Sequence, residues 1–429
     1  MSSEAPVAPI PCPAAWPVVR LSQIARKIGS GATPTGGQAA YQPTRSKFAL
    51  VRSQNVFDRG FSEAGLAFIS DAQAEGLRNV HLEQEDLLLN ITGDGVTFGR
   101  ACMVPPSLLP ACVNQHVSII RVDRNKADPG YVLGYLTHPV VKEYIEAFNA
   151  GGSRRAITKA HIESFVVPLP PLDTQKCISR VLAALDDRIA LLRESNATLE
   201  AIAQALFKSW FVDFDRVRAK QQGLAPAGMD EATAALFPDS FEGSALGPVP
   251  RAWSTGKVED LLELAYGKAL KAIDRVAGDV PVYGSGGVTG FHNCALVDSP
   301  TVVVGRKGTI GSLYWEDRPC FPIDTVFYVR ARVPLTFCFY QLRVLGLEGM
   351  NTDGAVPGLN RNNVYRLAVV IPPPPVFAAF DDLATNLRSK IFANETQAQT
   401  LTTLRDTLLP RLISGQLRLP EAEVALDAA

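Results

Sequence analysis

The stretch ISRVLAALDDRIALLRESNATLEAIAQALFKSW, residues 178–210, decides the fold of this chain. Its apolar residues recur at alternating intervals of four and three positions, the pattern of a helix that packs lengthwise against a second helix. Asn196 falls on this apolar stripe, where a polar residue costs stability and fixes the register of two helices. The proline-rich run before it predicts where the helix begins, because proline is tolerated in a helix's first turn. The large apolar residues of the stripe are Ile178, Leu182, Leu185, Ile189, Leu192, Leu199, Leu206 and Trp210.

The stripe returns further along the chain at a constant offset. Leu185 corresponds to Leu387, an offset of 202 residues, and the repeated pattern predicts a second helix over about 378–413. We expect the two helices to pack against each other. Short heptad patterns also occur in helices that lie separately on their own domains, and this alternative stays open. The second stripe includes Ile391, Leu401 and Leu408.

The segments upstream of the two helices also correspond. Gly93 and Thr97 match Gly305 and Thr309 at an offset of 212 residues. Each half is therefore expected to be a mixed domain of about 150 residues followed by a helix, in a pseudo-twofold internal repeat. Short β-like runs punctuated by glycine and proline predict the fold class α+β, with two tandem domains separated by two long antiparallel helices. The expected strands are 48–51, 86–91, 117–122, 301–304 and 325–329, and the expected domain helices are 131–150 and 335–347.

Shifts in composition predict the boundaries of these parts. Residues 223–243 are rich in Ala, Gly and Pro and carry four acids and no base, which is typical of an exposed linker. The predicted segments are a first domain over 14–171, a central helical region over 172–222, this linker over 223–243, a second domain over 244–375 and a C-terminal helical region over 376–418.

The bulk composition is that of an ordinary globular protein. The chain has 42 Lys and Arg against 43 Asp and Glu and is 47% hydrophobic, which excludes a largely disordered chain. No apolar run approaches the roughly 18 residues of a membrane-spanning helix, and the N-terminus lacks a secretory signal pattern. The seven Cys form no Cys-x-x-Cys pair and the five His are scattered, so we expect neither a disulfide framework nor a metal site. These features predict a cytoplasmic protein.

Catalytic patterns are missing from the sequence. It contains no phosphate-binding G-x-x-x-x-G-K-[ST] motif and no G-x-S-x-G nucleophile motif. The glycine-rich runs 93–99 and 284–290 have the wrong spacing for a dinucleotide fingerprint and lack the helix that should follow it. The run from Asp128 to Tyr131 fits a turn before a helix. We therefore predict no catalytic residue and no cofactor in this chain.

Polar clusters on loops remain, and they occur at matching places in both halves. Arg, Lys, Asn and Gln supply donors that read base edges, and neighbouring glycines let the backbone approach phosphates. For any one cluster taken alone, solvated turn residues are the preferred explanation, and it is the recurrence in both halves that favours DNA contact. The candidate DNA-contacting residues are Arg52, Asn55, Thr92, Arg154 and Arg155 in the first domain and Tyr283, Ser285, Arg306, Lys307 and Arg361 in the second.

The charge of each segment supports DNA contact. Residues 14–171 carry 16 bases and 13 acids, and residues 244–375 carry 13 bases and 11 acids. Both domains are therefore slightly basic, while the linker and the C-terminal region hold the surplus of acids. These surpluses are small for tight binding, so we expect the isolated chain to bind DNA weakly.

The sequence resembles the specificity subunit of type I restriction–modification systems over nearly its whole length. The segments GGSRRAITKAHIESFVVPLPPLDTQKCISRVLAALDDRI (151–189) and NATLEAIAQALFKSWFVDF (196–214) resemble the family's central shared region, and LRDTLLPRLISGQLRL (404–419) resembles its C-terminal one. VYGSGGVTG (282–290), VVVGRKGTIG (302–311) and AVPGLNRNNVYRL (355–367) are similar to one class of second target-recognition domain. A Gln-Lys-Cys and the run PPPPVFAAF depart slightly from the family pattern.

The resemblance implies two target-recognition domains that each read one part of a split, asymmetric site in double-stranded DNA. It further implies two methyltransferase (modification) subunits and restriction subunits as partners, with adenine methylation and cleavage carried out by those partners and no membrane partner. We expect the outer helix faces and the segment 207–214 to contact the methyltransferase. A predicted helix of about 50 Å holds two readers about 15 base pairs apart at most. The alternative is a divergent or fused DNA methyltransferase or endonuclease with its own site, which a cofactor-binding assay on the chain tests.

Overall fold

The computed structural model describes residues 7–94, 96–149, 155–351 and 358–417. These residues form two compact units, each of which contains one half of both long helices. Unit 1 consists of residues 1–191 and 397–429, and unit 2 consists of residues 192–396.

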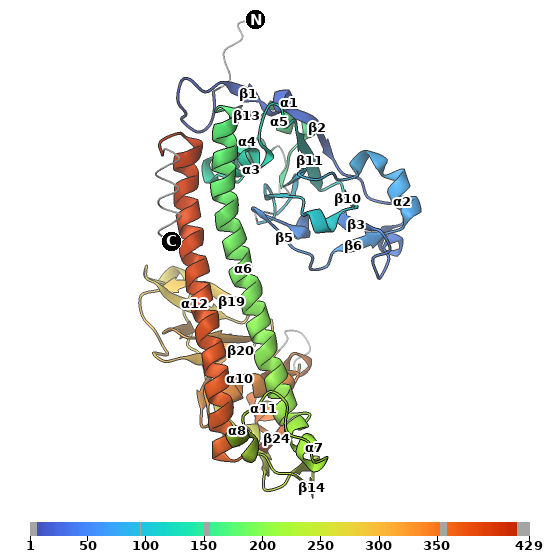
Figure 1. Cartoon of the computed structure of the whole chain (residues 1–429). Helices are drawn as coiled ribbons and strands as arrows, with labels where there is room; N and C mark the ends of the chain where they lie inside the picture. Colours follow the sequence, from blue (N-terminus) through green and yellow to red (C-terminus); the bar gives the residue numbers. More distant parts are fainter. Residues whose placement is uncertain (1–6, 95, 150–154, 352–357, 418–429) are drawn as a thin grey trace, which may run out of the picture. The chain divides into compact units, whose positions relative to one another are not determined.

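Unit 1 is built on two sheets (Figure 1). An antiparallel sheet has the order β2-β11-β7-β9, and a second sheet has the order β10-β3-β6, in which β3 and β10 are parallel. β1 pairs with β13 and so joins the two ends of the domain. The strands are β1 Val18–Arg20, β2 Ala25–Ser30, β3 Phe48–Val51, β4 Val56–Phe57, β5 Gly60–Phe61, β6 Ala67–Ile69, β7 Leu87–Asn90, β8 Thr92–Gly93, β9 Ala101–Met103, β10 Ala111–Val113, β11 Val117–Val122, β12 Arg155–Ala156 and β13 Val166–Pro168.

Unit 2 repeats the two sheets and the terminal strand pair of unit 1. Its antiparallel sheet has the order β17-β23-β20-β21, its second sheet has the order β19-β18-β22 with β18 and β22 parallel, and β16 pairs with β24 across the ends of the domain. The predicted internal repeat and α+β class are therefore confirmed at the level of topology. The strands are β14 Phe241–Ser244, β15 Gly247–Pro250, β16 Ser254–Lys257, β17 Leu262–Tyr266, β18 Val280–Gly284, β19 Gly287–His292, β20 Thr301–Gly305, β21 Leu313–Glu316, β22 Phe321–Pro322, β23 Val326–Ala331 and β24 Ala368–Ile371.

Capping residues and prolines determine where the short helices begin and end. Asp128 caps α3 by accepting a hydrogen bond from Tyr131 N at 2.9 Å, which confirms the predicted turn before a helix. The single helix expected over 131–150 is wrong: Pro139 divides it into α3 and α4, because proline lacks the backbone donor that would continue α3. The helices outside the long pair are α1 Leu21–Ile24, α2 Asp71–Gly76, α3 Pro129–Leu136, α4 Pro139–Ala147, α5 Lys159–Ser164, α7 Asp215–Gln221, α8 Glu231–Ala235, α9 Val258–Leu261, α10 Leu335–Val344 and α11 Arg361–Tyr365.

The two long helices, α6 (Leu172–Phe211) and α12 (Pro374–Ile413), lie side by side in each unit (Figure 1). Both begin a few residues earlier than their apolar stripes predicted, since their prolines are accommodated at or before the first turn. The expectation that the helices pack against each other is confirmed. Nine predicted stripe residues are buried, namely Ile178, Leu182, Leu185, Ile189, Leu192, Trp210, Ile391, Leu401 and Leu408, while Leu199 and Leu206 are half-buried.

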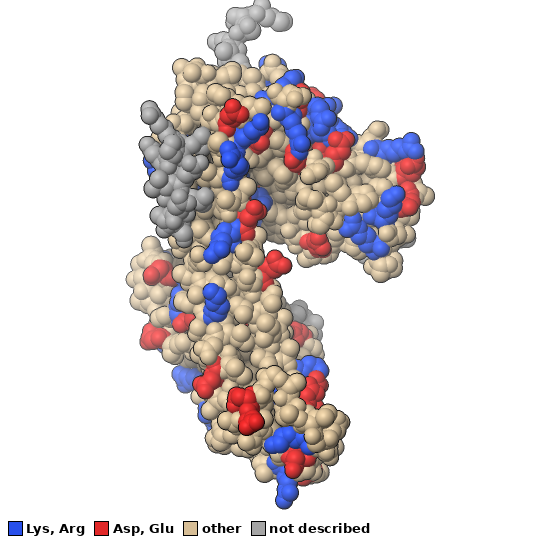
Figure 2. Space-filling view, in the orientation of Figure 1, with Lys and Arg blue, Asp and Glu red and all other residues tan. Residues whose placement is uncertain are grey.

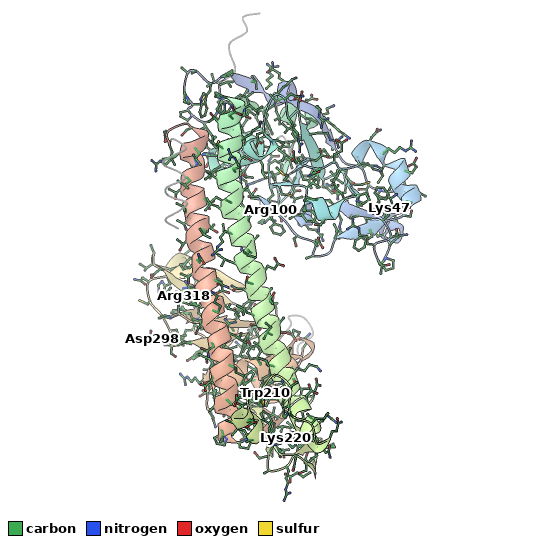
Figure 3. All side chains as sticks on the ribbon, viewed as in Figure 1. Lys47, Arg100, Trp210, Lys220, Asp298 and Arg318 are labelled. Carbon is green, nitrogen blue, oxygen red and sulfur yellow. The ribbon has the colours of Figure 1, made fainter. Side chains whose placement is uncertain are left out.

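An aromatic core fills unit 2 beside the end of α6. Trp210, labelled in Figure 3, is buried there in edge contact with Phe237 and Phe380. Phe237 lies within the predicted linker, so the 223–243 segment is only partly exposed: it forms α8, buries the ring of Phe237 in the core and packs Met229, Leu236 and Phe241 against it. The aromatic residues of 207–214 are buried in the same core, so Lys208 and Val212 are the exposed residues through which this segment could make the expected contact with a methyltransferase, which stays a prediction.

Candidate nucleic-acid interface

A short ladder in unit 1 brings together two of the predicted DNA-contacting loops. β8 pairs with β12, so that Thr92 lies opposite Ala156 and Gly93 opposite Arg155. The Thr92 hydroxyl lies 2.6 Å from His116 Nδ1, which adds the third polar loop to the same edge. We call Thr92, His116 and Arg155 the first edge. The neighbouring candidate Arg154 lies outside the described residues.

Unit 2 forms the equivalent edge from equivalent segments. Lys307 forms an isolated antiparallel bridge with Gly358, which corresponds to Ala156 at the offset of 202 residues. The guanidinium carbons of Arg306 and Arg361 lie 4.9 Å and 4.7 Å from the ring centroid of Tyr266. The edge therefore gathers three of the five predicted residues of this domain, and two of them, Arg306 and Arg361, lie against one aromatic ring. We call Tyr266, Arg306, Lys307 and Arg361 the second edge.

The cations of the second edge are not neutralised by neighbouring carboxylates. Among the described residues, no Asp or Glu oxygen lies within 4.0 Å of the charged nitrogens of Arg306, Lys307 or Arg361. Arg306 Nη1 donates instead to the backbone carbonyl of Asp324 at 2.9 Å, which orients the guanidinium and leaves its charge unpaired. Such groups are suited to phosphate oxygens or to guanine, because both accept from a guanidinium in a fixed geometry.

The first edge is less basic. Arg155 pairs with Glu146 at 2.6 Å, and both side chains are partly exposed. Figure 2 shows basic and acidic side chains interspersed on the visible face of both units, rather than a single basic surface. Contact with DNA at the first edge would therefore break the ion pair between Arg155 and Glu146 and replace it with a contact between Arg155 and a phosphate.

Several predicted residues have structural roles. Asn55 is fully buried, its amide donating to the carbonyls of Ser62 and Ala64 while its oxygen accepts from the backbone N–H of Arg52. Arg52 donates to the carbonyl of Gly65, so these two residues hold a loop together. A buried asparagine with every group paired cannot reach a base edge, and we do not carry Asn55 forward as a DNA contact.

Tyr283 and Ser285 are likewise engaged within unit 2. The Tyr283 hydroxyl donates to Glu316 at 2.9 Å, and burial together with this carboxylate raises the pKa of the phenol. The carbonyl of Ser285 accepts from the hydroxyls of Ser312 and Tyr314. Tyr283 is buried and Ser285 half-buried, so both support the loops beside the second edge.

Sequence reasoning missed Tyr266, the residue around which the second edge forms. Its ring is 47% exposed although it ends a strand of the central sheet. The available signal was an aromatic residue followed by glycine and lysine, and Gly267 allows a close approach because an added Cβ would lie 2.1 Å from the carbonyl oxygen of Ile323. In unit 1, Arg100, labelled in Figure 3, stacks over the exposed ring of Phe57 at 4.6 Å in a similar pairing.

The described residues show few features of a metal site, a cofactor site or a membrane-spanning segment. Within the described ranges, no three His, Cys, Asp or Glu side chains are grouped as a metal site requires. The glycine run that ends at Gly99 leads into β9, and the run that ends at Gly290 lies within β19, so neither begins a helix that would hold a phosphate. No helix among the described residues is long and apolar enough to span a bilayer.

Comparison with known proteins identifies the family. The profile described as "Type I restriction modification DNA specificity domain" matches residues 14–201 and 250–376, and the chain belongs to this family. It is the DNA specificity subunit of a type I restriction–modification system, in which catalysis resides in partner subunits. The family implies DNA and the modification and restriction subunits as partners.

Individual relatives agree with this assignment. The type I restriction enzyme HindI specificity subunit of Haemophilus influenzae is 25% identical, with 86% of this chain and 94% of that protein covered. The MjaIX specificity subunit of Methanocaldococcus jannaschii is 21% identical, over 66% of this chain and 67% of that protein. The crystal structure of an S subunit from M. genitalium covers 95% of this chain and 99% of that one, with a TM-score of 0.54 at 16% identity, and so has a similar fold.

Proposed function

We propose that each domain reads one half of a split, asymmetric site in double-stranded DNA, through the first edge in unit 1 and the second edge in unit 2. The observation that carries the proposal is the recurrence of one edge, built from equivalent segments, in both units. Two domains with the same backbone and different side chains at the same edge are suited to reading two different half-sites.

The proposed complex contains two methyltransferase subunits and restriction subunits. The domains that present the edges are proposed to extend over 14–171 and 244–375, with helical regions over 172–222 and 376–418. The two domains carry surpluses of only three and two bases (16 against 13 acids, and 13 against 11), so the partners are proposed to supply much of the positive surface that holds the DNA.

The roles of the edge residues follow from their surroundings. Arg306 and Arg361 are held by the ring of Tyr266, which limits their rotamers and favours a defined contact. Lys307 is exposed and unconstrained, which suits a phosphate contact that positions the duplex. Thr92 and Arg155 lie on the two paired strands, β8 and β12, that form the first edge.

The test is the double substitution Arg306→Ala with Lys307→Ala in the assembled complex, measured as DNA affinity at several salt concentrations. Loss of two phosphate contacts lowers the slope of log affinity against log salt by about 1.8. The charge-matched control is Arg251→Ala with Lys257→Ala, which removes two exposed cations from another part of the same unit. An unchanged slope in the first variant, or an equal fall in the control, would refute the second edge as the contact.

A further inference from the structure

Three polar layers interrupt the apolar contact between α6 and α12. In unit 1, Arg405 Nη1 donates to Asp186 at 2.9 Å. The other two layers lie in unit 2, and all three cross from one helix to the other. The layers are Asp186–Arg405, Asn196–Asn394 at 2.8 Å and Glu200–Arg388 at 3.2 Å.

Each layer is largely withdrawn from solvent and has additional partners. Asp186 also accepts from Arg59 Nε at 2.7 Å, and Glu200 also pairs with Arg343 at 2.8 Å. The Asn196 amide donates to the carbonyl of Ile391 at 3.2 Å. Each layer is therefore joined across the two helices by at least one hydrogen bond or ion pair, although Nε of Arg388 is buried without a partner of its own.

The apolar residues between these layers do not distinguish one helix from the other. Under the offset of 202 residues, Leu185 corresponds to Leu387 and Leu199 to Leu401, so both helices present nearly the same stripe. An antiparallel pair made from two copies of α6, or from two copies of α12, would pack these stripes as well as the native pair does.

The polar residues do distinguish the helices, because the repeat does not preserve them. Asp186 of α6 corresponds to Arg388 of α12, so the charge is inverted at equivalent places. The other residues of the three polar layers correspond to residues that lack the charged or amide group. These correspondences are Asn196 with Ala398, Glu200 with Thr402, Leu192 with Asn394 and Ala203 with Arg405.

Pairing of identical helices would therefore place the wrong groups together. In a pair of two α6 helices, Glu200 would face Asp186 of the other copy instead of Arg388, and Asn196 would face Leu192. In a pair of two α12 helices, Arg388 would face Arg405. Like charges and unpaired amides in a partly buried seam are costly, whereas the native pairing leaves neither.

We propose that the three polar layers select α12 as the partner of α6 and exclude pairing of either helix with the same helix of a second chain. An internal repeat creates the need for this selection, because it makes the two apolar stripes interchangeable. A fully apolar contact between the helices would be more stable. The polar layers lower that stability but are satisfied only when α6 pairs with α12.

The first test is Glu200→Arg in the full chain, with sedimentation velocity as the measurement. The introduced guanidinium would oppose Arg388 in the native pair and would attract Asp186 in a pair of two α6 helices. We expect the fraction of two-chain species to rise roughly tenfold or more over wild type. Glu194→Arg is the control, since Glu194 is exposed on the same helix. An increase no larger than that of the control would overturn the proposal.

The second test uses a variant that is expected to fold as the wild type does. Asn196→Leu with Asn394→Leu turns one polar layer into an apolar layer, which raises the melting temperature and at the same time increases the two-chain fraction. The control, Thr198→Leu with Thr403→Leu, adds two leucines at exposed positions. A variant that is more stable but associates no more than this control would show that the layer has no selective role.

Discussion

Asp186 is predicted to be the residue of unit 1 whose loss weakens the helix pair most. Its carboxylate accepts from Arg59 Nε at 2.7 Å and from Arg405 Nη1 at 2.9 Å, and the three side chains are only 20%, 8% and 17% exposed. Asp186→Asn preserves the shape and removes the charge, which leaves Arg59 without a counter-ion and Arg405 with only its ion pair to the exposed Asp406 at 2.8 Å. Breaking a buried pair in this way costs about 3–5 kcal/mol, and the partial exposure places this site near about 3 kcal/mol.

The assay is urea unfolding followed by far-UV circular dichroism. Of the four tryptophans only Trp16 belongs to unit 1, so tryptophan fluorescence reports mainly on unit 2 and separates the two units. The exposed neighbour provides the control, and Asp187→Asn is expected to change the free energy of unfolding by less than about 0.5 kcal/mol. Replacing the whole triad, as Arg59→Met, Asp186→Leu and Arg405→Met, is expected to restore stability to within about 1 kcal/mol. A change below about 0.5 kcal/mol for Asp186→Asn would refute the reasoning.

Two further predictions concern the length of the helices and the pH dependence of unit 1. Insertion of one heptad into each long helix, after Leu192 and before Gln397, lengthens the pair by about 10 Å and should lengthen the unread spacer by about three base pairs, as methylation mapping would show. Burial lowers the pKa of His138 from its ordinary 6.5, and its Nδ1 accepts from Val140 N at 3.1 Å as the cap of α4. The unfolded chain therefore binds this proton more readily, so stability is full above about pH 6.5 and declines below it. His138→Asn keeps a capping acceptor and should flatten that decline in pH-dependent urea unfolding; an unchanged decline would contradict the assignment.

The elements that local sequence determines were predicted well. The strands β3 and β11 occupy the predicted residues, because runs of buried β-branched and aliphatic side chains form strands wherever they fall in a sheet. The long helices were predicted from the spacing of their apolar residues, which alternates between four and three positions and fits only a helix. The predicted role of Asn196 in fixing register has a specific partner, Asn394, on the opposite helix.

The elements that depend on distant partners could not be predicted in the same way. The ion pair of Arg405 could not be predicted because its partner Asp186 is 219 residues away in the chain. Asn55 and Tyr283 looked like exposed donors because a sequence does not show whether a polar loop residue folds back onto its own backbone or onto a buried carboxylate. Tyr266 was missed because its importance comes from two arginines on separate loops.

The most direct test of the central claim is genome-wide mapping of N6-methyladenine in cells that carry the whole system. We expect a split DNA motif whose adenines are methylated only when this gene is present. Exchange of residues 244–375 for those of a relative should change one half of the motif and leave the other half intact. A motif that persists after deletion of the gene, or an exchange that alters both halves, would contradict the account.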